Sequence, residues 1–172
     1  MIPQVKRILY ATDLSDNSAY VFRYAINFAK KYDAGIVILH VLEQLSMTAN
    51  PITHSYLTKE EVKKISEEKS AYVKDHIKKQ LKIFCEKELK NDSECADRVE
   101  SIELCVGFPP DVILRKADEF NCDVIVMGTH GKGIIRNTLL GSSSKRVLRR
   151  TRKPVLIIPL PKEEADIGLG DV

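Results

Sequence analysis

The sequence contains no tryptophan, few aromatic residues and no large excess of either charge. Aromatic side chains make up only 6% of the 172 residues, so the core must consist mainly of Val, Ile, Leu and Ala. The net charge of +3 is too small to predict binding to nucleic acid or to a membrane by itself. No apolar stretch approaches the roughly 18 residues of a membrane helix. The first residues lack a signal-peptide layout, so we expect a cytoplasmic protein with no membrane association.

The four cysteines form no C-x-x-C pair, and no histidine cluster stands beside them, which argues against a zinc site. They are Cys85, Cys95, Cys105 and Cys122. We expect reduced, structural thiols. A disulfide between Cys85 and Cys95 is the alternative.

Short apolar runs alternate with segments of helical periodicity along the chain. The runs that predict buried strands are residues 6–11, 36–41, 99–106, 123–127 and 155–158. The helical segments are residues 19–29, 58–84, a segment that starts at Pro109, and 142–152. This alternation predicts a single α/β domain with a parallel sheet and helices on both faces. We expect the domain to span residues 1–161 and the acidic tail, 162–172, to be disordered.

Local signals mark the starts of two of these helices. Ser15 is the expected N-cap of the first one, and Thr58 with Glu61 forms a capping box before the long second one. The loop between residues 43 and 57 is unusually long. The second helix carries an apolar stripe that predicts core packing. The stripe consists of Val62, Ile65, Tyr72, Val73, Ile77, Leu81 and Phe84.

Open parallel sheets bind ligands at the carboxyl ends of their strands, where the strand order reverses. Two places qualify: Thr12 and Asp13 after the first strand, and the glycine-rich stretch 128–144 after the fourth. Glycine lets backbone N–H groups approach an anion closely. Gly141 and the three serines after it open a helix, whose free N–H groups attract anions. The stretch suits a polyphosphate; a flexible loop before a capped helix is the alternative that the residues alone leave open.

The stretch matches neither of two common nucleotide motifs. A P-loop requires serine or threonine after its Gly-Lys pair, whereas Gly133 follows Lys132 here. The dinucleotide fingerprint belongs after the first strand, where this chain has Ala11-Thr12-Asp13.

The spacing Gly128-x2-Gly131-x9-Gly141-Ser142 resembles the G-x2-G-x9-G-(S/T) signature of the ATP-binding branch of the universal stress protein family. Further segments resemble the family in the same order, so that the likeness covers nearly residues 4–160. They are Ile8–Asp13, Leu39–Val41, Gly107–Pro109, Asp123–Gly128 and Lys153–Ile158. The resemblance implies a Rossmann-like sheet of order 3-2-1-4-5, similar to the adenine nucleotide alpha-hydrolases, with the switch point between strands one and four.

The resemblance also implies an ATP site. Its residues would be Ala11, Thr12, Asp13, Val41, Met127, Gly128, His130, Gly131, Gly141, Ser142, Ser143 and Ser144. In this arrangement Asp13 lies by the adenosine, although capping the first helix is its alternative role. The backbone of Val41 bonds adenine, and the glycine and serine positions hold ribose and phosphates. His130 contacts a phosphate or is a solvated loop residue. Mg²⁺ or Mn²⁺ would be held through the phosphates and water.

The expected function is that of a nucleotide-dependent regulatory or chaperone-like module in the stress response, with an unidentified protein partner. A slow ATPase, an adenylate-transferring enzyme or a phosphotransferase of the same fold is the alternative. A nucleotide-free partner domain is disfavoured by Gly141-Ser142-Ser143. No pair of nucleophile and base is evident in the sequence. We also expect a homodimer through the fifth strand, 155–158, which the topology places at a sheet edge.

Basic residues crowd the last helix and the turn after it. They are Lys145, Arg146, Arg149, Arg150, Arg152 and Lys153. The cluster could form a surface for nucleic acid or an acidic partner, but a solvated helix face is favoured, because cations suit the negative end of a helix. Interleaved aromatic residues are missing, which argues further against nucleic acid.

Overall fold

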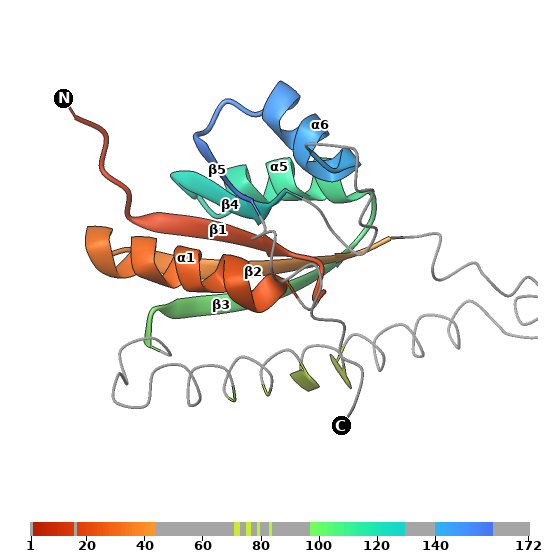
Figure 1. Cartoon of the computed structure of the whole chain (residues 1–172), viewed down its shortest axis with the longest axis horizontal. Coiled ribbons are helices and arrows are strands. Elements are labelled where there is room, and N and C mark those ends of the chain that lie inside the picture. The colour runs from red at the N-terminus through yellow and green to blue at the C-terminus, as the bar shows by residue number, and fades with distance from the viewer. Residues whose placement is uncertain are drawn as a thin grey trace, which may run out of the picture.

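The computed structural model describes residues 2–15, 17–43, 97–129 and 140–159, and six helical positions at 71–72, 75–76, 79 and 83. Within these ranges the chain forms a parallel sheet between two layers of helix (Figure 1). The elements are β1 (Arg7–Thr12), α1 (Ser18–Tyr32), β2 (Gly35–Leu42), β3 (Val99–Val106), α5 (Pro109–Glu119), β4 (Val124–Gly128), α6 (Ser142–Arg150) and β5 (Val155–Ile158).

The five strands lie in the order β3-β2-β1-β4-β5, and every neighbouring pair is parallel. The predicted fold class and strand order are therefore confirmed. Tyr10 in the central strand pairs with Ile38 of β2 on one side and with Val126 of β4 on the other. The strand order reverses between β1 and β4, so the carboxyl ends of these two strands flank the switch point.

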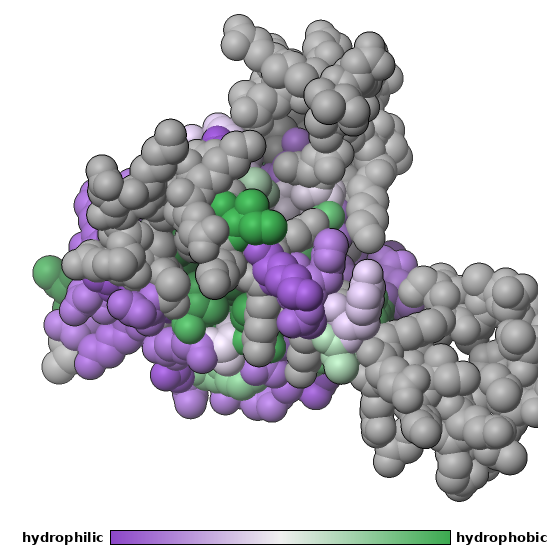
Figure 2. All heavy atoms as spheres, turned by 90° about the horizontal axis from the view of Figure 1, so that it is seen from below, coloured by the Kyte–Doolittle hydropathy of each residue, from purple (hydrophilic) through white to green (hydrophobic). Residues whose placement is uncertain are grey.

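Each face of the sheet packs against its own layer of helix. In β1, Ile8 and Tyr10 pack in the core formed with α1, and Leu9 packs in the opposite core with residues of α5 and α6. Successive side chains of a strand point to opposite faces, so a buried strand must be apolar throughout. Figure 1 shows α1 on one side of the sheet and α5 and α6 on the other. On the α1 side, hydrophilic residues cover most of the described surface (Figure 2).

Two predicted helix ends were wrong. The N-cap of α1 is Asn17 instead of Ser15, because the Ser15 hydroxyl donates a hydrogen bond to Asp13 in the turn before the helix. The last helix ends at Arg150 instead of residue 152. Thr151 adopts an extended conformation there, and its hydroxyl accepts a hydrogen bond from the backbone N–H of Lys153.

Most of residues 43–97, including the predicted loop, the capping box, Cys85 and Cys95, lies outside the described residues. Tyr72 is described, and its side chain is 74% exposed with its ring stacked on His76. The assignment of Tyr72 to a buried stripe was therefore wrong, because Tyr72 shares a helix face with the polar His76. Cys105 and Cys122 are free thiols, as expected. The predicted tail, 162–172, is likewise outside the described residues, and the helices that are described include none that could span a membrane.

Candidate functional site

The carboxyl ends of β1 and β4 bring together the two sequence segments expected to bind a ligand. The pairing of Tyr10 with Val126 places Thr12, at the end of β1, beside Gly128, at the end of β4. Ala11 and Met127 precede them in the same two strands. The structure thus brings five predicted site residues together, counting Asp13 in the turn after β1. His130 and Gly131 lie outside the described residues.

The turn after β1 is fixed by hydrogen bonds to one oxygen of Asp13. Oδ1 accepts from the backbone N–H of Ser15 at 3.2 Å, from the Ser15 hydroxyl at 2.8 Å and from the Ser18 hydroxyl at 3.2 Å. Leu14 has a φ of 59°, in the left-handed region that non-glycine residues adopt rarely. Its N–H donates to Oγ1 of Thr12 at 3.1 Å, which helps to hold this conformation.

The second carboxylate oxygen of Asp13, Oδ2, is buried and has no hydrogen-bond partner among the described residues. A buried acceptor without a donor is costly, so such groups are rare and require an explanation. The two roles considered for Asp13 are therefore compatible. Oδ1 organises the turn before α1, whereas Oδ2 has no donor among the described residues.

His40, near the end of β2, joins the end of its own strand to the end of β1. Its side chain is buried, and Nδ1 lies 2.8 Å from the carbonyl oxygen of Thr12. Because a carbonyl only accepts, Nδ1 carries the hydrogen and donates it. This buried contact gives His40 a structural role, since it is bonded to the residue before Asp13 and precedes Val41 in β2.

The start of α6 is tied to the end of β4 by two hydrogen bonds. The backbone N–H of Gly141 donates to the carbonyl oxygen of Thr129 at 2.7 Å, and the Ser144 hydroxyl donates to that of Gly128 at 2.9 Å. Ser144 is buried, whereas Ser142 is exposed. The Ser144 hydroxyl proton is therefore committed to the fold. The first-turn N–H groups at Ser142 and Ser143 have no partners within the helix and point along its axis toward the switch point.

The loop before α5 reaches the same edge of the sheet. The N–H of Gly107 donates to the carbonyl oxygen of Leu42 at 2.9 Å, next to Val41 at the end of β2. The guanidinium of Arg146 on α6 lies over the ring of Phe108, 5.0 Å from its centroid. This contact connects the start of α5 with α6.

A divalent cation would need ligands that the described residues do not group together. Among these residues no cluster of three His, Cys, Asp or Glu side chains could hold a metal ion. The only acidic side chain at the switch point within the described ranges is Asp13. Within the described ranges, the residues at this edge thus offer no preformed cage for a cation.

This strand order, with a helix N-terminus at the switch point, defines a Rossmann-like α/β protein. The sequence profile of the universal stress protein family matches residues 4–159. The chain belongs to this family.

Two archaeal relatives from Methanocaldococcus jannaschii illustrate the match. Universal stress protein MJ0577 is 28% identical over 153 residues, which are 89% of this chain and 94% of the relative. Universal stress protein MJ0531 is 31% identical over 159 residues, which are 92% and 85% of the two chains. Among solved structures, MJ0577 has a TM-score of 0.67 at 24% identity, with 92% of this chain and 99% of that chain covered. UspA from Lactobacillus plantarum has a TM-score of 0.66 at 20% identity, with 91% and 99% covered.

Proposed function

We propose that this protein binds ATP at the carboxyl edge of β1 and β4 and acts as a nucleotide-dependent regulatory or chaperone-like module in the stress response of the cytoplasm. The observation that carries the proposal is the buried Oδ2 of Asp13, which has no donor among the described residues, at the strand edge to which the start of α6 is also tied. Adenosine offers hydroxyl and amino donors to such an oxygen, and the helix N-terminus offers N–H donors to phosphate.

The nucleoside end of the ligand would lie against the ends of β1, β2 and β4. There Asp13 accepts a hydrogen bond from ribose or adenine, and the backbone of Val41 bonds the adenine edge. The short side chain of Ala11 leaves room for the base, and Thr12, Met127 and Gly128 complete this part of the site. The contact of His40 with the Thr12 carbonyl supports the proposal, because it holds the first two of these strand ends together.

The phosphates would lie against the glycine-rich stretch 128–144, which includes the start of α6. Gly141 has φ −64° and ψ 162°, an extended conformation that directs the chain into the helix. The N–H groups of Ser142 and Ser143 would then face the phosphates. Gly131 and His130, earlier in the same stretch, would contact them as well. Ser144 would contribute through its backbone, since its hydroxyl bonds Gly128. Mg²⁺ or Mn²⁺ would be coordinated by phosphate oxygens and water.

A universal stress protein solved in complex with cAMP supports an adenine nucleotide as the ligand class for this fold. That protein is 23% identical to this chain, with a TM-score of 0.52, and the alignment covers 91% of this chain and 98% of that protein. The likeness supports the shared fold, and the assignment of ATP to this chain rests on Asp13 and the start of α6.

A conservative change at Asp13 tests the proposal. In Asp13→Asn the amide oxygen can keep the three hydrogen bonds of Oδ1, while the NH₂ group replaces the acceptor Oδ2 by a donor. We expect the affinity for ATP with Mg²⁺, measured by isothermal titration calorimetry, to fall at least about tenfold, or roughly 1.4 kcal/mol. Glu119→Gln, an exposed carboxylate on α5, is the matched control. Unchanged affinity in a folded Asp13→Asn protein, or no binding of ATP to the wild type, would refute the proposal.

A further inference from the structure

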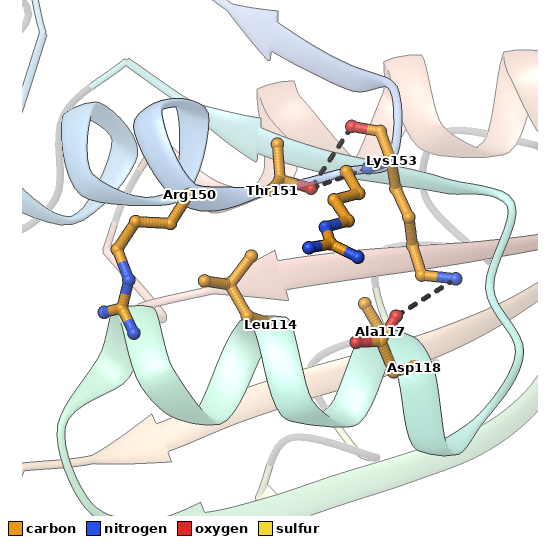
Figure 3. Close-up of a pocket in the computed structure, with 7 residues that line it drawn as sticks. Leu114, Ala117, Asp118, Arg150, Thr151 and Lys153 are labelled. Carbon is orange, nitrogen blue, oxygen red and sulfur yellow. Dashed lines mark hydrogen bonds and ion pairs between the residues drawn. The ribbon is translucent and has the colours of Figure 1, made fainter.

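A hollow of about 230 Å³ lies between α5 and the turn that joins α6 to β5 (Figure 3). Its residues come from the second half of α5 and from the segment 150–153 that precedes β5. Helix α5 begins at the carboxyl edge of the sheet and runs back toward the amino edge, where β4 and β5 begin. The hollow therefore lies at the amino edge, opposite the candidate nucleotide site, and is not part of it.

The hollow combines an apolar floor with a basic rim. Leu114 and Ala117 project from α5 beneath the turn, as Figure 3 shows, and Ala117 is fully buried. The rim carries one carboxylate, Asp118 of α5, and three cations from one short segment, Arg150, Arg152 and Lys153, so its charge is positive overall. Such a surface fits a ligand that carries an aliphatic group and negative charges close together.

The turn that carries the cations is held in one conformation. The Thr151 hydroxyl accepts a hydrogen bond from the N–H of Lys153 at 3.0 Å and lies 3.2 Å from the Lys153 carbonyl oxygen, to which it donates. A fixed backbone reduces the entropy lost when side chains on it are ordered by a ligand. The backbone positions from which Arg152 and Lys153 extend are therefore restrained before any partner binds.

The cations are only partly neutralised. Arg150 pairs with Asp111, and Lys153 pairs with Asp118 at 3.3 Å, but the Asp118 side chain is 77% exposed. Exposed pairs of this kind contribute only about 0–1 kcal/mol, so a ligand carboxylate can replace either acid. Arg152 has neither an ion pair nor a hydrogen bond within the described part of the chain. It is the cation most available to a partner.

We propose that this hollow binds an acidic peptide segment of a partner protein, with one aliphatic side chain against the half-buried Leu114 and carboxylates at Arg152 and its neighbours. Arginine pairs with carboxylates through two parallel hydrogen bonds, which gives both affinity and orientation. A nucleic acid fits less well, because the lining contains no aromatic ring on which a base could stack. The proposal is independent of the nucleotide site.

The test uses the full-length chain and two fluorescein-labelled peptides. One peptide has a leucine between two pairs of glutamates, and the other has serine in place of leucine. Fluorescence polarisation at low ionic strength gives their dissociation constants for wild type, Arg152→Glu and Arg149→Glu. Arg149 is exposed on α6, close to Arg152 in sequence, but does not line the hollow, so its reversal changes the net charge equally. Arg152→Gln serves as a second variant in case Arg152→Glu folds poorly.

We expect the leucine peptide to bind the wild type at least roughly fivefold more tightly than the serine peptide, since one buried aliphatic side chain contributes 1 kcal/mol or more. Arg152→Glu should weaken the leucine peptide about tenfold or more, whereas Arg149→Glu should change it by less than about threefold. ATP binding should be the same in all three proteins. Equal losses in the two arginine variants, equal affinities for the two peptides, no binding of the leucine peptide, or tighter Arg152-dependent binding of a single-stranded oligonucleotide would overturn the proposal.

Discussion

The imidazole Nδ1 of His40 donates a hydrogen bond of 2.8 Å to the carbonyl oxygen of Thr12, where β1 leaves the sheet. The donor and acceptor are 28 residues apart in sequence but belong to paired positions of β1 and β2. The buried ring thereby fixes the position of Asp13 relative to Val41. These two residues would contact the same nucleoside from different strands.

Replacing His40 with leucine should therefore reduce both stability and ligand affinity. The Thr12 carbonyl would lose a buried donor, which costs about 1–3 kcal/mol of unfolding free energy. Affinity for ATP should fall because the two strand ends are no longer held together. Urea denaturation and calorimetry measure the two effects. His76→Leu, at an exposed helical position, is the control, and a His40→Leu protein as stable as that control would contradict this role.

Substitutions at Gly141 and Ser144 should have different effects: the first should lower ATP affinity, and the second should lower stability. Because Gly141 is in an extended conformation that any residue adopts, Gly141→Val should leave stability nearly unchanged. Its side chain would stand where phosphate approaches the helix, so ATP affinity should drop at least about tenfold. Ser144→Ala should instead cost roughly 1 kcal/mol of stability through the lost bond to Gly128 and change affinity less. If Gly141→Val lowered stability but not ATP affinity, and Ser144→Ala lowered affinity but not stability, the phosphates would not lie at the start of α6.

Cys122 should make stability sensitive to alkaline pH. Burial raises the pKa of this thiol from 9.0 to about 11. The unfolded thiol loses its proton first, so the stabilising effect is complete below pH 9 and is lost as the pH rises toward 11. Urea denaturation at several pH values should show that wild type loses more stability over this interval than Cys122→Ala. Identical slopes for the two proteins would show that Cys122 does not contribute.

The apolar strand β5 should mediate a homodimer. It is an edge strand whose second side has no neighbouring strand among the described elements, and three of its four residues are only half-buried. Unpaired apolar edges favour association. Pro159, which has no N–H to donate, would end the pairing. Sedimentation at micromolar concentration should give the mass of a dimer, and a monomer would count against this interface.

Turnover of ATP should be slow, well below the typical enzymatic rate of about 10 s⁻¹. Fast hydrolysis requires a side chain that orients water and a cation that stabilises the leaving phosphate. Asp13 uses Oδ1 in the turn, and Arg146 lies over Phe108. Phosphate release under saturating ATP and magnesium measures the rate. Turnover above about 1 s⁻¹ that is abolished by a single substitution sparing ATP affinity would make the protein an enzyme.

The sequence predicted the fold well because its signals are local. The bounds of β3 and β5 coincide with the predicted ranges 99–106 and 155–158, since turn residues bracket both runs. Strand order followed from the family resemblance. Tyr72 was misplaced because its apolar ring suggested a buried position, whereas it is exposed and shares a helix face with the polar His76.

Side-chain partners in the site could not be predicted in the same way. The bond from His40 to Thr12 and that from Ser144 to Gly128 join residues that only the folded sheet brings together. Sequence position suggested two roles for Asp13 but could not show that its two oxygens divide them. That division depends on Ser15 and Ser18, whose hydroxyls both turn toward Oδ1.

The most direct test of the nucleotide site is a crystal structure of the protein with ATP and Mg²⁺. We predict a donor of the ribose or adenine within hydrogen-bond distance of Asp13 Oδ2, about 2.5–3.2 Å, and phosphate oxygens at the N–H groups of Ser142 and Ser143. A nucleotide bound at another edge of the sheet, or one that leaves Asp13 Oδ2 without a donor, would contradict the assignment.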